Sequence, residues 1–204
     1  MHPNPAFRRE PEARNVAFAR ARGFGTLCVN GPEAPLLAHV PFLLGEGEAR
    51  FHLVRSNPVA RALPARAVLA ATGPDGYVSP DWYGLTDQVP TWNYVAVHLE
   101  GPVERLPQEA MRTELDALSD AFEGRLAKRP WRTTKMTPEV LDRMMRQIVP
   151  CRMAVEAIRG TWKLNQNKPE AARLGAAAEV EAAGLGTEPA ALATLMRMAA
   201  SATT

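Results

Sequence analysis

The stretch Trp92–Leu106, WNYVAVHLEGPVERL, alternates apolar and polar residues over most of its length. Successive side chains of a β-strand point to opposite faces of a sheet, so this period of two predicts one long strand. Shorter apolar or alternating runs precede it at Gly25–Gly31, Pro35–Gly45 and Ala49–Ser56, separated by Gly, Pro and Asn residues. This pattern is typical of successive antiparallel strands joined by turns.

Two further segments complete the strand pattern. Ala67–Pro74, AVLAATGP, contains too many apolar residues for a half-solvated strand, which predicts a strand buried on both faces. Strand character returns at Cys151–Leu164. Together with the runs above, these segments predict an open or closed sheet of about six strands.

Helical signals flank and interrupt the strands. Pro11–Arg22 predicts an amphipathic N-terminal helix, followed by a glycine that can end it. Asn57 and Pro58 predict a helix of one or two turns, because asparagine is a favoured N-cap and proline suits the first helical position. Two more helices are predicted over Pro107–Glu123 and Thr137–Ile148, the first from an apolar stripe at helical spacing.

The composition changes near Pro169, beyond which the chain is rich in Ala, Glu and Gly. Leu192, Leu195 and Met196 are spaced for a short helical face, and the alternative is a frayed tail. Strands that come first, helices inserted after them and a returning strand predict an α+β, mainly β, barrel domain rather than a parallel α/β sheet.

The 204 residues are 46% hydrophobic and 23% charged, which is the composition of an ordinary globular protein. Apolar runs stay shorter than the roughly 18 to 20 residues that cross a bilayer, and the N-terminus lacks the apolar stretch of a secretion signal. We therefore expect a cytoplasmic protein with no membrane association. Cys28 and Cys151 lie in apolar runs without metal-ligand spacing, which favours reduced core thiols.

Charge is distributed unevenly along the chain. Arg125–Arg173 contains twelve Lys and Arg against four Asp and Glu, whereas Ala67–Gly124 contains two against ten. The basic stretch could attract a phosphate or a nucleic acid. A solvated surface that offsets the acidic part is the favoured interpretation, and no helix-turn-helix pair is evident.

Five segments are too polar and aromatic to be simple turns: His39–Phe42, Phe51–Pro58, Gly73–Gly84, Val89–Tyr94 and Gly160–Lys168. In the second of them an arginine at a strand end is followed at once by a helix-start signal. Such a site offers a guanidinium and backbone N–H groups to an anion, most naturally a phosphate. The alternative, which the segment alone leaves equally open, is an arginine paired with a surface carboxylate.

The third segment combines Ser79 with Tyr77, Trp82 and Tyr83, a mixture suited to a planar ring with a polar tail. A hydrophobic loop plug is an equally good interpretation. Elsewhere, His39 and His52 each stand alone in an apolar strand, so hydrogen-bonded core histidines are favoured over metal ligands. The absence of GxSxG disfavours a hydrolase, and the usual glycine-rich loops for dinucleotides and nucleoside triphosphates are missing.

Taken in order, these segments resemble those of the PaiB family of FMN-binding negative transcriptional regulators. The matching motifs are Met1-His2-Pro3, Phe7, Gly25-Thr26-Leu27, HVPFLL, HLVRSNP, GPDGYVSPDWY, VPTWNYVAVHLEG, Phe122-Glu123, Arg129-Pro130-Trp131, Gln147-Ile148-Val149 and GTWKLNQNK. The resemblance covers about residues 1–175 and leaves 176–204 as an Ala-rich helical extension or tail. It implies a six-stranded antiparallel split β-barrel with flanking helices, related to pyridoxamine 5′-phosphate oxidase, and a homodimer that binds FMN between its subunits.

The resemblance also implies roles for individual residues. Arg55 and Asn57 would hold the phosphate side, joined by Tyr77 and Ser79. The segment His39, Val40, Pro41 and Phe42 would run beside the isoalloxazine, where backbone amides can meet ring heteroatoms. Trp92 and Asn93, with Lys163, Gln166 and Asn167, would close the site from the partner chain. Asn165 stands where the family usually has a serine, and Pro150 where it usually has a glycine.

Three functions follow as hypotheses. The first is a flavin-carrying dimer that represses transcription, with DNA as a possible partner. The second is a flavin-dependent oxidoreductase that uses NAD(P)H and a small substrate, in which the cofactor does the redox chemistry and the protein positions it. A role alongside an acetyltransferase, with which such proteins are paired by name, is a third hypothesis that the sequence does not test.

Overall fold

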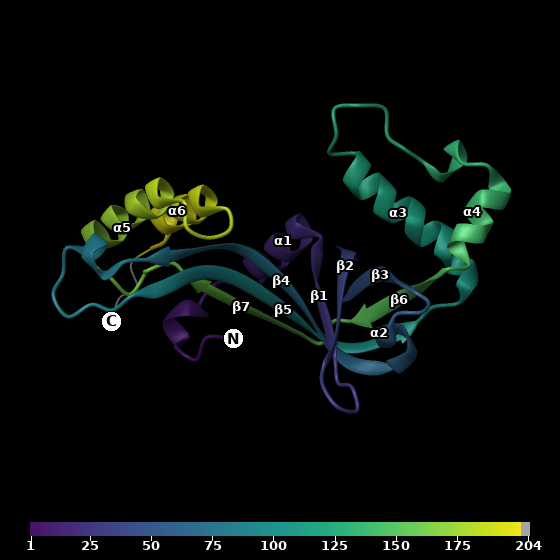
Figure 1. Ribbon diagram of the computed structural model, residues 1–204, viewed down its shortest axis with the longest axis horizontal. Helices are drawn as coiled ribbons and strands as arrows, with labels where there is room; N and C mark the ends of the chain where they lie inside the picture. Colours follow the sequence, from purple (N-terminus) through teal and green to yellow (C-terminus); the bar gives the residue numbers. More distant parts are fainter. Residues whose placement is uncertain (201–204) are drawn as a thin grey trace. The chain divides into compact units, whose positions relative to one another are not determined.

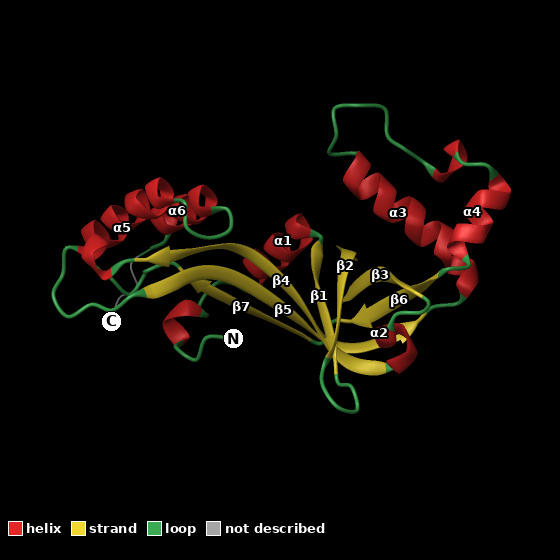
Figure 2. Ribbon diagram, in the orientation of Figure 1, coloured by secondary structure: helices red, strands yellow, loops and turns green. Residues whose placement is uncertain are grey.

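A computed structural model describes residues 1–200, which contain seven β-strands and six α-helices (Figures 1 and 2). The strands are β1 (Phe24–Val29), β2 (Leu36–Leu44), β3 (Glu48–Val54), β4 (Ala65–Val78), β5 (Thr91–Arg105), β6 (Ile148–Ala154) and β7 (Ala157–Lys163). The α-helices are α1 (Glu12–Arg22), α2 (Pro58–Ala62), α3 (Met111–Glu123), α4 (Pro138–Met145), α5 (Glu170–Ala183) and α6 (Pro189–Met198). No helix within residues 1–200 is long and apolar enough to cross a membrane.

The strands form one sheet in the order β4-β1-β2-β3-β6-β5-β7. An additional pairing of β4 with β5 joins the ends of the order β4-β1-β2-β3-β6-β5, so six strands form a ring of hydrogen-bonded neighbours. The registers of β1 with β2 and β4, of β2 with β3, and of β6 with β3 and β5 are all antiparallel. The predicted fold class, a mainly β α+β barrel with flanking helices, is confirmed. The returning segment predicted as one strand forms two, β6 and β7.

The chain divides into two compact units. The terminal unit comprises Met1–Asn15, Thr72–Val97 and Arg159–Thr204, and the central unit comprises Val16–Ala71 and His98–Ile158. Strands β4 and β5 each contribute residues to both units because they are long.

The central unit contains β1, β2, β3 and β6 around an apolar core. Leu27, Phe42, Leu53 and Leu69 are almost completely buried there. Alternation places these side chains on the inner face of their strands. Helix α3 is tied to β3 by an ion pair in which Arg50 Nη1 lies 3.0 Å from Glu114 Oε1.

In the terminal unit, α5 and α6 cover one face of the β4 and β5 segments that belong to it (Figure 1). Leu192 and Met196 on α6 are fully buried. A Cβ atom on Gly76 of β4 would lie 2.9 Å from Leu192 Cδ2, so this helix packs closely on the strand. The helical alternative predicted for the C-terminal region is confirmed, and it buries an apolar face.

Local signals also agree with the structure, with one correction. The Asn57 side chain caps α2, because its Oδ1 accepts a hydrogen bond of 2.8 Å from Val59 N. Gly23, with a φ of 56°, ends α1. The prediction that Ala67–Pro74 is buried on both faces is wrong: most of β4 alternates buried and partly exposed residues, as a strand of an antiparallel sheet with one core face does.

Candidate functional site

Arg55 follows β3 in the central unit and is held by neutral groups. Its Nε donates to Arg146 O at 2.9 Å, and its Nη2 donates to Gln108 Oε1 at 2.6 Å and to Ile148 O at 3.2 Å. Among residues 1–200 no carboxylate forms an ion pair with it, so the alternative of an arginine neutralised by a surface carboxylate does not apply. The guanidinium is therefore fixed in position while its charge stays uncompensated, which suits the reception of an anion.

Asn57 lies two residues after Arg55, and its side chain caps a helix. Its Oδ1 is occupied by the cap of α2, which leaves the Nδ2 group as the donor available to a ligand. Arg55 and Asn57 thus stand together at one end of β3, as the sequence predicts from their neighbouring positions.

The segment His39–Phe42 lies on β2 and has two different faces. Val40 and Phe42 are 2% and 1% exposed, so their side chains belong to the core and only their backbone could meet a ligand. His39 points to the opposite face, where its Nδ1 lies 3.0 Å from Thr26 Oγ1 of β1. The interpretation of His39 as a core histidine is wrong, because this ring is exposed. Within residues 1–200 no group of three or more His, Cys, Asp or Glu is placed to hold a metal.

An apolar strip accompanies His39 on this outer face of β1 and β2. The register places Phe24 opposite Pro41 and Cys28 opposite Leu37. Phe24 is 55% exposed and Leu37 is 60% exposed. Phe24 and Leu37 lie on either side of the Thr26–His39 pair. Exposed apolar side chains of this size on a solvent-facing sheet are typical of a surface that another molecule covers.

Aromatic rings gather in the terminal unit. Tyr77 packs edge-to-face against Trp82 and Trp92, with ring centroids 6.1 Å and 6.3 Å apart. Trp92 is 47% exposed, and with Tyr94 it lines a hollow of about 460 Å³. Ser79 precedes the short helix Pro80–Tyr83 without capping it by its side chain. Trp92 therefore presents aromatic surface to solvent, which suits a planar ring, whereas the burial of Tyr83, at 4% exposed, fits the loop-plug interpretation of its own segment.

A polar cavity of about 270 Å³ lies in the same unit. Its lining includes Lys163, Asn165, Asn167 and Lys168, together with Tyr83. Lys163 Nζ donates to Trp92 O at 2.7 Å and also contacts Thr91 Oγ1. Burial, and then the charge of Lys168, lower the pKa of the Lys163 ammonium group. The lining thus contains two lysines and one carboxylate, that of Asp87, so the cavity suits groups that accept hydrogen bonds.

Asn165 supplies a second unusual feature of this cavity. The Tyr83 hydroxyl donates to Asn165 Oδ1 at 3.1 Å, while the buried Nδ2 has no hydrogen-bond partner within residues 1–200. Asn165 itself is 2% exposed and has a φ of 62°, a left-handed conformation that asparagine tolerates better than most residues. A buried amide donor without a partner is costly and indicates a position for an acceptor atom.

Asn165, Tyr83 and Lys168 do not belong to the residue set implied by the resemblance. In the sequence, Asn165 is distinguished only by standing where the family usually has a serine. The hydrogen bond to Tyr83 joins residues 82 positions apart, so no local pattern could have revealed it.

Two residues of that set have their side chains turned away from the cavity. Asn93 is fully buried, and its Nδ2 lies 3.5 Å from Met196 Sδ of α6. Gln166 braces its own loop, because its Nε2 donates to Trp162 O at 2.6 Å and its Oε1 accepts from Leu164 N at 2.8 Å. The structure thus brings Lys163 and Asn167 together at the cavity and gives Asn93 and Gln166 structural contacts.

Comparison with known proteins identifies the family of this domain. The family described as "Putative FMN-binding domain" matches residues 1–157. The chain belongs to this FMN-binding family. A curated relative, "Protease synthase and sporulation protein PAI 2" of Bacillus subtilis, is 29% identical over 75% of this chain and 76% of the relative. The resemblance to PaiB proteins is therefore confirmed, and FMN is the cofactor.

Further comparisons extend the family and the fold. An uncharacterized Aspergillus fumigatus protein is 24% identical over 81% of this chain and 84% of its own length. The FAD and heme binding protein of Mycobacterium smegmatis has a TM-score of 0.57 at 21% identity, covering 77% of this chain and 73% of that one. The conserved hypothetical protein Rv2991 of Mycobacterium tuberculosis has a TM-score of 0.56 at 20% identity, covering 80% and 92%. These two structures show that the fold is shared.

The donor set of this chain fits FMN. A phosphate requires cationic and N–H donors, and Arg55 carries a charge that no carboxylate neutralises. A flavin ring requires flat apolar walls and donors for its carbonyl oxygens and ring nitrogens. The exposed Trp92 offers the first of these, and the unpartnered Asn165 Nδ2 offers the second.

Proposed function

We propose that this protein is a flavin-carrying homodimer that acts as a negative regulator of transcription. The observation that carries the proposal is the guanidinium of Arg55, which is held only by neutral oxygens and therefore keeps its charge for a phosphate. The name of the Bacillus relative connects that protein with protease synthesis and sporulation, which supports a regulatory role.

Each residue that the resemblance implies has a role in the proposed flavin site. Arg55 and Asn57 of the central unit bind the phosphate, and Tyr77 and Ser79 are the further phosphate-side residues that the resemblance implies. Backbone groups of His39, Val40, Pro41 and Phe42 run along the ring, and Trp92, Asn93, Lys163, Gln166 and Asn167 close the site from the partner chain. Asn93 and Gln166 act by shaping the backbone, since their side chains are engaged within their own unit. The bound cofactor supplies redox chemistry, and the Lys163 charge favours its reduced, anionic form.

The outer face of β1 and β2 supports the dimer. Phe24 and Leu37 expose more than half of their surface there. A second copy of the chain that covers this strip removes apolar surface from water and brings another chain close to His39.

A flavin-dependent oxidoreductase is the second candidate function. It is favoured by the hollow of about 460 Å³ that Trp92 and Tyr94 line, because a planar ring such as a nicotinamide can lie against exposed aromatic side chains.

Three measurements on purified protein separate these functions: flavin absorbance, nicotinamide oxidation and gel retardation of a promoter fragment. Flavin absorbance establishes that FMN is retained, and the oxidation of NADH and NADPH measures turnover. We expect a yellow protein without turnover that retards its own promoter fragment in a gel, with binding that weakens as salt is raised. Turnover without any shift of the fragment would replace the regulator by the oxidoreductase, and a colourless protein that takes up no added FMN would refute both.

A further inference from the structure

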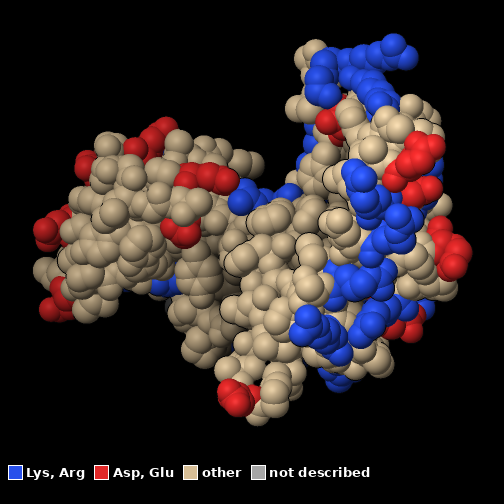
Figure 3. Space-filling view, turned by 45° about the vertical axis from the view of Figure 1, so that its right-hand side comes forward, with Lys and Arg blue, Asp and Glu red and all other residues tan. Residues whose placement is uncertain are grey.

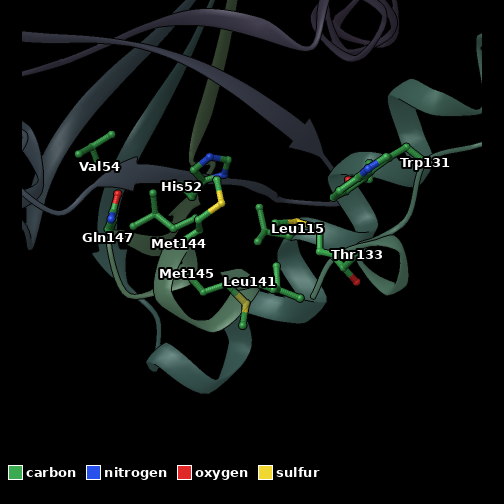
Figure 4. A pocket seen from close by; sticks show the side chains of 12 residues that line it. His52, Val54, Leu115, Trp131, Thr133, Leu141, Met144, Met145 and Gln147 are labelled. Carbon is green, nitrogen blue, oxygen red and sulfur yellow. The ribbon is translucent and has the colours of Figure 1, made fainter. Parts of the chain in front are cut away.

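The central unit contains a cavity of about 340 Å³ that the proposed function does not use. It lies between α3, α4 and β3 (Figure 4). His52 and Val54 come from β3, Leu115 from α3 and Met144 from α4, while Trp131 precedes the short helix Thr133–Lys135. Its volume is within the range of roughly 300 to 1,000 Å³ that small-molecule sites occupy.

The lining of this cavity is apolar and adaptable. Met136, Met144 and Met145 contribute three thioether side chains, and none of the lining residues is Lys, Arg, Asp or Glu. Methionine fills irregular space and packs well against aromatic rings. Arg55 lies beside this lining, because its Nη2 donates to Ile148 O at 3.2 Å and its backbone N donates to Gln147 O at 2.8 Å. The lining itself suits an apolar ring and not a phosphate.

His52 is the polar group best placed to orient a ligand. Figure 4 shows its imidazole at one side of the cavity and the Trp131 indole at the other. Burial lowers the pKa of His52, and no hydrogen bond contributes to that change. Within residues 1–200 neither ring nitrogen has a hydrogen-bond partner. The imidazole is therefore neutral near pH 7 and offers one donor and one acceptor.

The cavity is also open to solvent. Met144 is 53% exposed and Val54 is 54% exposed, although both line it. A ligand can therefore enter this hollow from solvent and reach a polar group that has no protein partner.

We propose that this cavity binds a small, uncharged aromatic molecule with a single hydrogen-bonding group, which lies among the methionines and bonds to His52. The site adjoins the proposed phosphate position, because Arg55 follows Val54 and donates to Ile148 O, and both of these residues line the cavity. The aromatic molecule binds there while FMN occupies its own site. A regulator with such a site would respond to an aromatic metabolite as well as to its cofactor.

The test uses FMN-saturated protein and two probes of the same shape, 2-naphthol and naphthalene, titrated by calorimetry. We expect one 2-naphthol per chain. The variant His52→Leu should weaken the binding of 2-naphthol about three- to tenfold, which corresponds to the loss of one hydrogen bond. The affinity for naphthalene should change by less than about twofold. Met144→Trp should abolish binding of both probes by filling the space. Met198→Trp, on an α6 residue that is 72% exposed, is the control and should change neither.

Several outcomes overturn the proposal. These are no binding of either probe, displacement of 2-naphthol by FMN, and unchanged affinities in Met144→Trp. A Met144→Trp variant that changes oligomeric state in a protein that binds no probe would assign the hollow to a protein interface. An equal loss of affinity for both probes in His52→Leu would show that His52 forms no hydrogen bond with 2-naphthol. Circular dichroism of each variant checks that the fold is retained.

Discussion

The oxygens around Arg55 fix the position of its guanidinium and leave its charge without a counterion. Three neutral acceptors hold the side chain, from Gln108, Arg146 and Ile148. A salt bridge would have fixed the same side chain equally well but would have cancelled the field that attracts a phosphate. The partners of an arginine, more than its exposure, therefore decide whether it can bind an anion.

Arg55→Gln tests this role. The variant keeps a hydrogen-bonding side chain but removes the charge, and FMN affinity should fall by about 1.5 to 3 kcal/mol, the scale of a charge-assisted hydrogen bond. Fluorescence titration of FMN measures the change. Arg66→Gln is the matched control, because Arg66 is an exposed arginine that pairs with Glu156. Equal affinities for Arg55→Gln and the unchanged protein would remove Arg55 from the site.

The buried imidazole of His52 makes the free energy of unfolding depend on pH. Burial lowers its pKa from the ordinary 6.5, so below pH 6.5 the unfolded chain binds a proton that the folded chain resists. This contribution to stability is fully present above pH 6.5 and is lost as the pH falls toward the lower folded pKa.

Urea unfolding at pH 7.5 and at pH 5 measures the effect. The unchanged protein should lose more of its free energy of unfolding between these values than His52→Phe does, because phenylalanine does not titrate. Parallel losses in the two proteins would show that His52 is not protonated differently in the folded and unfolded states.

At the scale of elements, α6 depends on a buried arginine of α5. Arg173 is 2% exposed, and its Nη1 donates to the carbonyl oxygens of Met196 and Arg197 at the C-terminal end of α6. The last carbonyls of a helix have no partner within the helix, so a neighbouring cation satisfies them and also matches the helix dipole.

Arg173→Leu should therefore lower the free energy of unfolding by about 1 to 3 kcal/mol, since it leaves buried acceptors without donors. Arg197→Leu is the control: it breaks only the exposed pair with Glu181 and should cost less than about 1 kcal/mol. Urea denaturation compares the two, and similar costs would mean that Arg173 does not hold α6.

The elements that the sequence predicts well have signals confined to a few adjacent residues. The Asn57–Pro58 cap and the alternation of Trp92–Leu106 depend on neighbours, and both agree with the structure. The length of β4 depends instead on partners. The sequence predicts this strand only as far as Pro74, yet it extends to Val78, and Tyr77 N donates to Leu185 O at 3.1 Å.

The candidate site shows the same difference between features that depend on nearby residues and features that depend on distant ones. Arg55 and Asn57 are two residues apart in sequence, so their proximity could be predicted. The packing of Asn93 against α6 and the bond between Tyr83 and Asn165 join distant segments, and sequence alone does not contain them. The division of the chain near residue 175 stays a prediction.

At the scale of the whole molecule, the strip on β1 and β2 predicts the assembly. Leu37→Glu places a charge in the proposed interface, where its desolvation is unfavourable, and should convert the dimer to a monomer that retains less FMN. Analytical ultracentrifugation measures the mass. Leu126→Glu, at another exposed leucine of the central unit, should leave the dimer intact. A dimer that persists in Leu37→Glu would place the interface elsewhere.

The two thiols of the chain differ enough to serve as a built-in probe. Cys151 is fully buried, and burial raises its pKa to about 12, whereas Cys28 is partly exposed on the outer face of β1. Only the thiolate reacts with alkylating reagents, so a maleimide modifies Cys28 alone without any engineered mutation. A second copy that covers this strand would slow the alkylation of Cys28 in the native chain, and Leu37→Glu would restore the rate.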